Sequence, residues 1–194
     1  PGVGAVSTHL HKKPSDARNY TMKRNTVAVV SDGSAILGLG NLGPVPALPV
    51  MEGKAAIFKE LADIDAIPIL LDTQEPEEII RTVKHIAPGF GGINLEDIAA
   101  PKCFEIEERL KAELDIPVMH DDQHGTAIIS GAALLNALEL AGKRIEEVRV
   151  VFIGAGAAGI ASARFYISLG VRREHLVMVD LRGVIRTDNA EPGE

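Results

Sequence analysis

Apolar runs and helical stripes alternate along the chain and predict a repeated strand–helix order. Short runs rich in Val, Ile and Leu are typical of strands buried on both faces, and they alternate with segments whose apolar residues recur every three or four positions. Gly, Pro and Asp mark the turns between them. We expect strands at 27–30, 67–71, 90–95, 116–119, 149–153 and 176–179, and helices at 54–65, 76–87, 103–114, 126–141 and 157–169.

This order predicts an α/β fold with right-handed crossovers and a largely parallel sheet. The helix at 126–141 is apolar nearly all round, so we expect it to be buried between two domains, and it closes at Gly142. We place the domain boundary there. Residues 1–142 are predicted as a parallel-sheet N-terminal domain and residues 143–194 as the first part of a Rossmann-type dinucleotide-binding domain. Because only one βαβ unit follows the boundary, we expect the chain to be a fragment of a longer protein.

Composition narrows the possible functions. The 194 residues, 46% of them hydrophobic, can bury a core. The formal net charge of −7 argues against nucleic-acid binding, which needs clustered Lys and Arg. No apolar run reaches membrane-spanning length, and no signal peptide is visible at the start. The single cysteine, Cys103, rules out an intrachain disulfide and indicates a reducing compartment, so we expect a cytoplasmic protein.

Two pairs of acidic residues follow predicted strands. Glu96 and Asp97 come directly after the third strand, and Asp121 and Asp122 come just after the fourth. In an open parallel sheet, ligands bind beyond the carboxyl ends of the strands, and neighbouring strands lie about 5 Å apart. Converging carboxylates would suit Mg²⁺ or Mn²⁺ rather than zinc. The ordinary alternative is that these acids cap the helices that follow, with Asp122 and Thr126, for example, forming a plain helix start.

The alternation of side chains along an extended strand limits which of these acids can bind one ion. Glu96 and Asp97 can both be ligands only if the strand ends at that point. By the same rule, we expect only one of Asp121 and Asp122 to ligate directly.

A glycine-rich turn, residues 154–159, follows a predicted strand and opens a helix. That context is typical of the dinucleotide-binding fingerprint, in which the glycines permit the tight turn, the approach of the pyrophosphate and close helix packing. Asp180 ends the next strand, where it can accept a hydrogen bond from a ribose hydroxyl. An acid there favours NAD, but Arg182 could receive a 2′-phosphate, so NAD and NADP both stay open. The alternative is a plain strand–helix turn.

Lys54 follows a glycine-rich loop, residues 37–44, that lacks the Lys-Ser/Thr of a nucleotide P-loop. We place Lys54 at the start of the helix at 54–65, where a cation opposes the helix dipole. This unfavourable position indicates a function, whereas a solvated lysine is the ordinary alternative.

Four ordered segments resemble the malic enzymes, most closely the short bacterial and archaeal type. They are Val30-Ser-Asp-Gly-Ser-Ala-Ile-Leu-Gly-Leu-Gly-Asn-Leu-Gly43, Pro49-Val-Met-Glu-Gly-Lys54, Asn94-Leu-Glu-Asp-Ile98 and His120-Asp-Asp-Gln-His-Gly-Thr-Ala127. The resemblance covers essentially the whole chain. It implies oxidative decarboxylation of L-malate to pyruvate and CO₂, with NAD or NADP and with Mg²⁺ or Mn²⁺, in a homo-oligomer.

The resemblance also implies roles for individual residues. Glu96, Asp97 and Asp122 match the metal ligands, Lys54 matches the general base, and Asp121 matches an acid close to the reacting centre. The cofactor contacts are expected from Gly154, Ala155, Gly156, Ala157, Ala158, Gly159, Asp180 and Thr126.

The chain departs from the family at its first residue. Malic enzymes carry a Tyr-Thr pair directly before Pro-Gly-Val, and this chain begins at that Pro, so the proton-donating Tyr is absent and we expect poor turnover by the chain as given. Ala35 stands where larger eukaryotic relatives have Arg. Two other functions stay open: another two-domain dehydrogenase of amino or hydroxy acids, which would work without metal, and a non-catalytic binding module.

Overall fold

The computed structural model describes residues 2–36 and 38–186, which form two compact units of the predicted α/β class. The first unit is built on a four-stranded sheet in the order β2-β1-β3-β4, in which β1 runs parallel to both β2 and β3. The strands span β1 Thr26–Ser31, β2 Asp65–Leu70, β3 Gly92–Leu95 and β4 Val118–His120.

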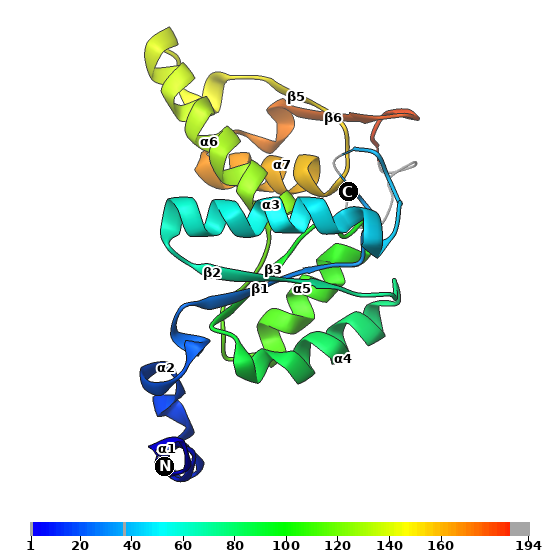
Figure 1. Cartoon of the computed structure of the whole chain (residues 1–194). Coiled ribbons are helices and arrows are strands. Elements are labelled where there is room, and N and C mark those ends of the chain that lie inside the picture. The colour runs from blue at the N-terminus through cyan, green and yellow to red at the C-terminus, as the bar shows by residue number, and fades with distance from the viewer. Residues whose placement is uncertain (1, 37, 187–194) are drawn as a thin grey trace. The chain divides into compact units, whose positions relative to one another are not determined.

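Helices cover both faces of this sheet (Figure 1). Helix α3 (Pro44–Ala62) packs on β1 and β2 from one side, and α4 (Pro76–Ile86) and α5 (Lys102–Glu113) lie on the other. Because β1 is covered on both faces, Ala28, Val29 and Val30 are all fully buried. The sequence of this central strand is therefore a continuous apolar run, as predicted.

Short helices precede β1 and were not predicted. They are α1 (Gly2–Lys12) and α2 (Ala17–Tyr20), linked by the 3₁₀ turn η1 (Pro14–Asp16) and followed by η2 (Met22–Arg24). Asp16 accepts from His9 at 2.7 Å and pairs with Lys13 at 3.1 Å, which ties α1 to the turn that follows it.

The strand order creates a switch point at the centre of the sheet. From β1 the chain crosses to β2 on one side, whereas β3 and β4 are added on the other side. The connections that leave β1 and β3 therefore diverge at their carboxyl ends. Crevices of this kind are where open α/β sheets bind ligands.

The second unit contains the predicted βαβ pattern. Strands β5 and β6 are parallel, a short β7 runs antiparallel to β6, and α6 packs against α7. A Cβ added to Gly131 of α6 would lie 2.5 Å from Phe165 Cε1 of α7, so the helices approach closely there. The bounds are α6 Asp121–Ala141, η4 Ile145–Glu147, β5 Val150–Ile153, α7 Ala157–Leu169, η5 Arg173–His175, β6 Leu176–Asp180 and β7 Gly183–Val184.

Most predicted elements are confirmed, but two helices begin earlier than predicted. Helix α3 begins at Pro44, ten residues before the predicted start, and α6 begins at Asp121 rather than at residue 126. On α6, Ile129 is 70% exposed and Leu140 is 91% exposed, so this helix is not buried all round within the described chain. The domain boundary at Gly142 stays a prediction.

None of the described helices is both long and apolar enough to span a membrane.

Candidate metal and active site

The strand β3 ends at the residue before the first acidic pair. Glu96 N still donates to Val30 O at 2.9 Å, but the backbone of Asp97 turns into the left-handed region, with φ of 53°. A non-glycine residue is rarely held there unless the surroundings require it. This turn ends the strict alternation of side chains, so Glu96 and Asp97 can both serve one site. Both residues are buried.

Two side chains hold the Glu96 carboxylate, one on each oxygen. Lys54 Nζ lies 3.2 Å from Oε1, and Asn94 Nδ2 donates to Oε2 at 2.8 Å. Asn94 precedes Glu96 by two positions on β3, so both side chains leave the same face of the strand. A buried charged group is stable only when it has partners of this kind.

Lys54 does not lie at a helix start, which corrects the sequence-based placement. Helix α3 begins at Pro44, so Lys54 lies three turns into it and the argument from the helix dipole does not apply. Proline is tolerated in the first turn of a helix, which hid this start from the sequence pattern. The position of Lys54 follows instead from where α3 begins.

The glycine-rich loop before α3 folds back onto the end of β1. Leu42 N and Gly43 N both donate to Gly33 O, at 3.2 and 3.1 Å. Gly33 has φ of 66°, and a Cβ there would overlap the carbonyl of Gly43. The close approach that these glycines permit is therefore between two parts of the chain itself, and it fixes the point from which α3 carries Lys54 toward Glu96.

The turn after β1 adds polar residues that the sequence analysis did not single out. Asp32 is fully buried, and its Oδ1 accepts from Ser34 N at 3.0 Å and from Ser34 Oγ at 2.6 Å. Ala35 N donates to Asp97 O at 3.0 Å, which ties this turn to the end of β3. The sequence signal was an Asp-Gly-Ser turn directly after a buried strand.

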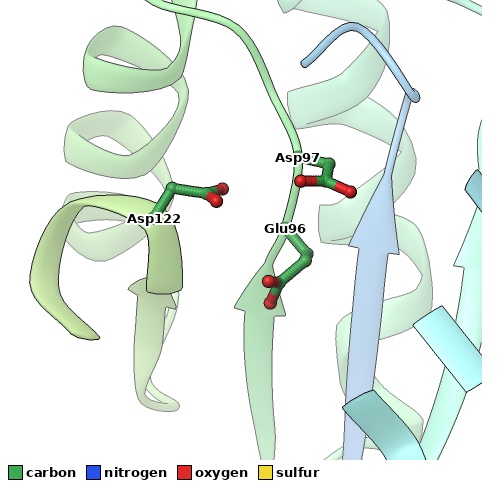
Figure 2. A group of neighbouring side chains, drawn as sticks. All are labelled: Glu96, Asp97 and Asp122. Atoms are coloured by element: carbon green, nitrogen blue, oxygen red, sulfur yellow. The ribbon is translucent and has the colours of Figure 1, made fainter. Parts of the chain in front are cut away.

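The structure brings three of the predicted ligands together (Figure 2). Glu96, Asp97 and Asp122 each offer a carboxylate oxygen, and these atoms lie within 4.8 Å of one another. Asp122 follows β4, which is adjacent to β3 in the sheet. His120 is fully buried at the end of β4, and its Nε2 lies 3.5 Å from Asp122 Oδ2.

Asp121 does not join this group of three. It occupies the first position of α6, where the positive end of the helix dipole stabilises an acid. Asp121 Oδ1 lies 2.5 Å from where a Cβ on Gly125 would be, so Gly125 leaves the space that the carboxylate fills. Because Asp121 and Asp122 both lie on a helix, the strand alternation used to separate their roles does not apply; their different roles remain a prediction.

The residues present fit a divalent cation. Three carboxylate oxygens form the hard donor set that Mg²⁺ and Mn²⁺ prefer, and at metal–oxygen distances of about 2.1 Å their spacing is close to that of ligands on one ion. A second observation also indicates a polar ligand. Asn94 is 3% exposed and its Oδ1 has no hydrogen-bond partner within residues 2–36 and 38–186. Buried acceptors are rarely left in that state.

The glycine turn of the second unit has the geometry of a phosphate cradle. Gly154 has φ of 118°, and neither Gly154 nor Gly156 has any atom within 4 Å of an added Cβ, so the turn is open. At Gly159 an added Cβ would overlap the Gly154 carbonyl, as expected for the glycine that packs helix on strand. Ala157 and Ala158 form the first turn of α7, whose amide groups face an approaching anion.

A cavity of about 540 Å³ lies at this turn. Asp180 lines it from the end of β6, together with Arg182. The Asp180 carboxylate accepts from Arg182 Nε at 2.6 Å and from Arg182 N at 2.7 Å. The Arg182 side chain thereby holds the pKa of Asp180 below its ordinary value. Thr126, the remaining cofactor candidate, is exposed on α6 and is not among the residues that line this cavity.

Two family models match different parts of the chain. The family model described as malic enzyme, N-terminal domain matches residues 1–111, and the model described as malic enzyme, NAD binding domain matches residues 123–191. The chain is 60% identical to an NAD-dependent malic enzyme of Geobacillus stearothermophilus and 54% identical to an NADP-dependent malic enzyme of Halomonas elongata. These alignments cover 97% and 96% of the chain but only 39% and 44% of the relatives.

A solved structure is also similar. The crystal structure of the NAD-dependent malic enzyme of Thermotoga maritima matches with a TM-score of 0.93 and 56% identity, over 97% of this chain and 49% of that one. The chain therefore spans less than half the length of these relatives.

Proposed function

The chain belongs to the malic enzyme family, and we propose that the protein oxidatively decarboxylates L-malate to pyruvate and CO₂ while reducing NAD or NADP, with Mg²⁺ or Mn²⁺ bound. The observation that carries this proposal is the contact of Lys54 with Glu96 inside a group of three carboxylates. A candidate proton acceptor therefore lies next to a candidate cation site. Oxidation of a hydroxyl bound to a metal requires both groups.

Glu96, Asp97 and Asp122 would hold the divalent cation. When bound, the cation supplies positive charge beside the substrate oxygens, which favours loss of the hydroxyl proton and then loss of CO₂. Two of these carboxylates are buried, so little water competes for the ion on their side. Three protein ligands leave the remaining positions of an octahedral ion for substrate and water.

Lys54, as the neutral amine, would take the proton of the malate C2 hydroxyl as hydride leaves C2. Its Nζ lies 3.2 Å from Glu96 Oε1, so the side chain is held next to the site before substrate arrives. Asp121, at the start of the same helix as Asp122, would act as the acid near the reacting centre. Gly125 leaves the space that this side chain needs.

The turn at residues 154–159 would bind the cofactor pyrophosphate through the amide groups at the start of α7. The matching family model is an NAD-binding domain, and the cavity at the turn ends at Asp180, where a ribose would lie. We also propose Thr126 as a cofactor contact, although it lies outside this cavity. The family includes NAD-dependent and NADP-dependent relatives, so both nucleotides are candidates.

A steady-state assay tests the proposal. The full protein is incubated with L-malate, Mn²⁺ and either NAD or NADP, and pyruvate and reduced cofactor are measured together. We expect both products in equal amounts and their loss when the metal is chelated. Reduced cofactor without pyruvate, or turnover that survives chelation, would instead identify a different dehydrogenase.

We also propose a cytoplasmic homo-oligomer. The one cysteine, Cys103, is buried and the chain has no second cysteine to pair with, which suits a reducing compartment. Sedimentation of the full protein should give a mass of at least two subunits, and a monomer at micromolar concentration would contradict the oligomer.

A further inference from the structure

Asn94 contacts Glu96 and has no assigned role. It lies on β3 two positions before Glu96, and the pair share one face of the strand. Both side chains are almost completely buried, with 3% and 5% exposed. An amide at a central strand position is costly to bury, so its presence needs a reason.

The orientation of the Asn94 amide is fixed by its neighbour. Its Nδ2 lies 2.8 Å from Glu96 Oε2. The opposite orientation would place Oδ1 against a carboxylate oxygen, which is repulsive, so the donor must face Glu96. That leaves Oδ1 as a buried acceptor with no partner in the described residues.

We propose that Asn94 is a positioning residue for Glu96, and that it holds this carboxylate ready to bind the divalent cation. The inference rests on the metal role proposed above. Lys54 occupies one Glu96 oxygen and Asn94 occupies the other, so the carboxylate is restrained at both ends. A glutamate side chain has three torsions, and a ligand whose torsions are already fixed loses less freedom when the ion binds.

The unused Oδ1 has a role in the same arrangement. Mg²⁺ gives up its water reluctantly and usually keeps several molecules when it is bound to a protein. A water held by the cation would be a donor, and the buried Asn94 Oδ1 would accept its hydrogen bond. Asn94 would then act on the ion only through Glu96 and through water, and it would take no part in bond breaking.

Metal affinity tests this inference without reference to turnover. Mn²⁺ binding to the full protein is measured by the electron paramagnetic resonance signal of the free ion. We expect Asn94→Ala to weaken binding by roughly tenfold to a hundredfold, the usual effect of removing a group that orients a metal ligand. Saturating Mn²⁺ should restore most of kcat, because the variant keeps every group that touches substrate.

Asn25→Ala is the matched control. Asn25 Nδ2 donates to Asp63 O at 2.6 Å, so this variant also removes an amide that crosses between elements of the same unit, but next to the amino end of β1. It should leave Mn²⁺ affinity unchanged. Equal losses in the two variants would overturn the inference.

Asn94→Leu is a second variant, because it keeps the branching of the side chain at Cγ and replaces its amide oxygen and nitrogen by methyl groups, so it leaves no cavity. It should weaken Mn²⁺ binding as Asn94→Ala does. If neither variant folds, the wild-type protein still gives a result: the side-chain amide signals of Asn94 must shift when Mg²⁺ is added, and signals that do not shift would overturn the inference.

The failure of this inference is distinct from failure of the proposed function. Wild-type protein that binds no Mn²⁺ would remove the metal site itself. Wild-type protein that binds Mn²⁺ with the same affinity as a folded Asn94→Ala variant would remove only the role of Asn94.

Discussion

Glu96 is held by side chains from other elements, whereas the turn at residues 154–159 is held by its own residues and by one backbone bond to β6, in which Gly154 N donates to Val179 O at 2.7 Å. Around Glu96, the sheet brings together Asn94 from β3, Lys54 from α3 and the backbone of β1. In the turn, Gly159 packs on the carbonyl of Gly154, five residues before it. The first site depends on side chains that the fold brings together, and the second depends mainly on the backbone of one strand–turn–helix segment and its neighbouring strand β6.

The two regions also differ in exposure. Glu96 and Asp97 are buried and fixed by ion-pair and backbone contacts, while the glycine turn borders an open cavity. A buried site is sensitive to the loss of any one partner, because a charge left unpaired in the interior is costly. An exposed turn is affected mainly by substitutions whose side chains block its surface. The predictions below follow from this difference.

The largest effect is expected at Lys54. Lys54→Ala should lower kcat of the full protein by about a hundredfold to ten-thousandfold, the usual loss when a general base is removed. Lys59→Ala is the control on the same helix, since Lys59 pairs only with Asp63 and Asp65 at the exposed end of α3 among the contacts described. Steady-state kinetics at saturating malate measures both. A loss no larger than that of the control would contradict the role of Lys54.

A smaller effect is expected at the glycine turn, where two glycines should respond differently. Gly156→Ala adds a Cβ that meets no atom, so the protein should fold normally but bind the pyrophosphate on the order of tenfold to a hundredfold more weakly, as for one or two lost hydrogen bonds to a charged group. Gly159→Ala should lower the temperature of unfolding, because its Cβ overlaps the Gly154 carbonyl. Cofactor titration and thermal unfolding separate the two. Equal destabilisation by both variants would show that the turn is not locally built.

Gly125 should show a still smaller, specific effect on catalysis. The Cβ of Gly125→Ala would displace Asp121, and kcat should fall by about tenfold, since a misplacement of about 1 Å can cost up to a hundredfold. Gly53→Ala on α3 is the comparison, because its Cβ meets no atom. Alanine in place of a helical glycine should stabilise the fold there by about 0.5–1 kcal/mol. Unchanged kcat in the Gly125 variant would argue against a role for Asp121.

The smallest effect concerns the ion pair at the end of β6. Arg182 holds the pKa of Asp180 below the ordinary value of 3.8, mainly through its side-chain hydrogen bond. Because the folded pKa is depressed, this stabilisation is present above the unfolded pKa and is lost as pH falls through the folded value. In Arg182→Ala the pKa of Asp180 should rise toward 3.8, as measured by carbon NMR of its carboxyl group. An unshifted pKa would mean that the pair does not form in solution.

The same variant also tests whether Arg182 influences the preference for NAD or NADP. Arg182 is the described cation beside Asp180 in the cavity, so its removal leaves an uncompensated acid where a 2′-phosphate would lie. NADP binding should weaken by several-fold more than NAD binding, in line with the modest energy of an exposed charge pair. Equal changes for the two nucleotides would exclude Arg182 from the choice.

The comparison also explains what the sequence could predict. Helix α7 and strand β6 were placed within one residue, and their glycine turn was identified, because all of that information is local. The start of α3 was missed because Pro44, Pro46 and Pro49 look like breaks, although proline is accepted in a first turn, where Pro44 and Pro46 lie, and Pro49 lies inside the helix. The start of α6 was missed because Asp121 and Asp122 were interpreted as possible ligands after the fourth strand. Acidic residues are also typical of the first turn of a helix.

The partners of Glu96 show where local information ends. Asn94 could have been found, because residues two apart on a strand share a face. The contact with Lys54 could not, because it depends on the loop that folds back on Gly33 and on the register of α3 against the sheet. The end of the strand at Leu95, which lets Glu96 and Asp97 serve one site, was anticipated as a condition and is observed.

The contact between α6 and α7 at Gly131 acts on two remote points at once. Helix α6 begins with Asp121 and Asp122, and α7 begins at the glycine turn. The two acids and the glycine turn therefore lie at the N-termini of two helices that contact each other near their midpoints. Phe165 fills the space that a methyl group at 131 would need, and Tyr166 Oη donates to Ser130 O at 3.1 Å in the same contact. The separation between the two acids and the glycine turn therefore depends on how closely α6 and α7 pack at this contact. A methyl group added at residue 131 would meet Phe165 and push the helices apart, although it would change no residue proposed to bind metal or cofactor.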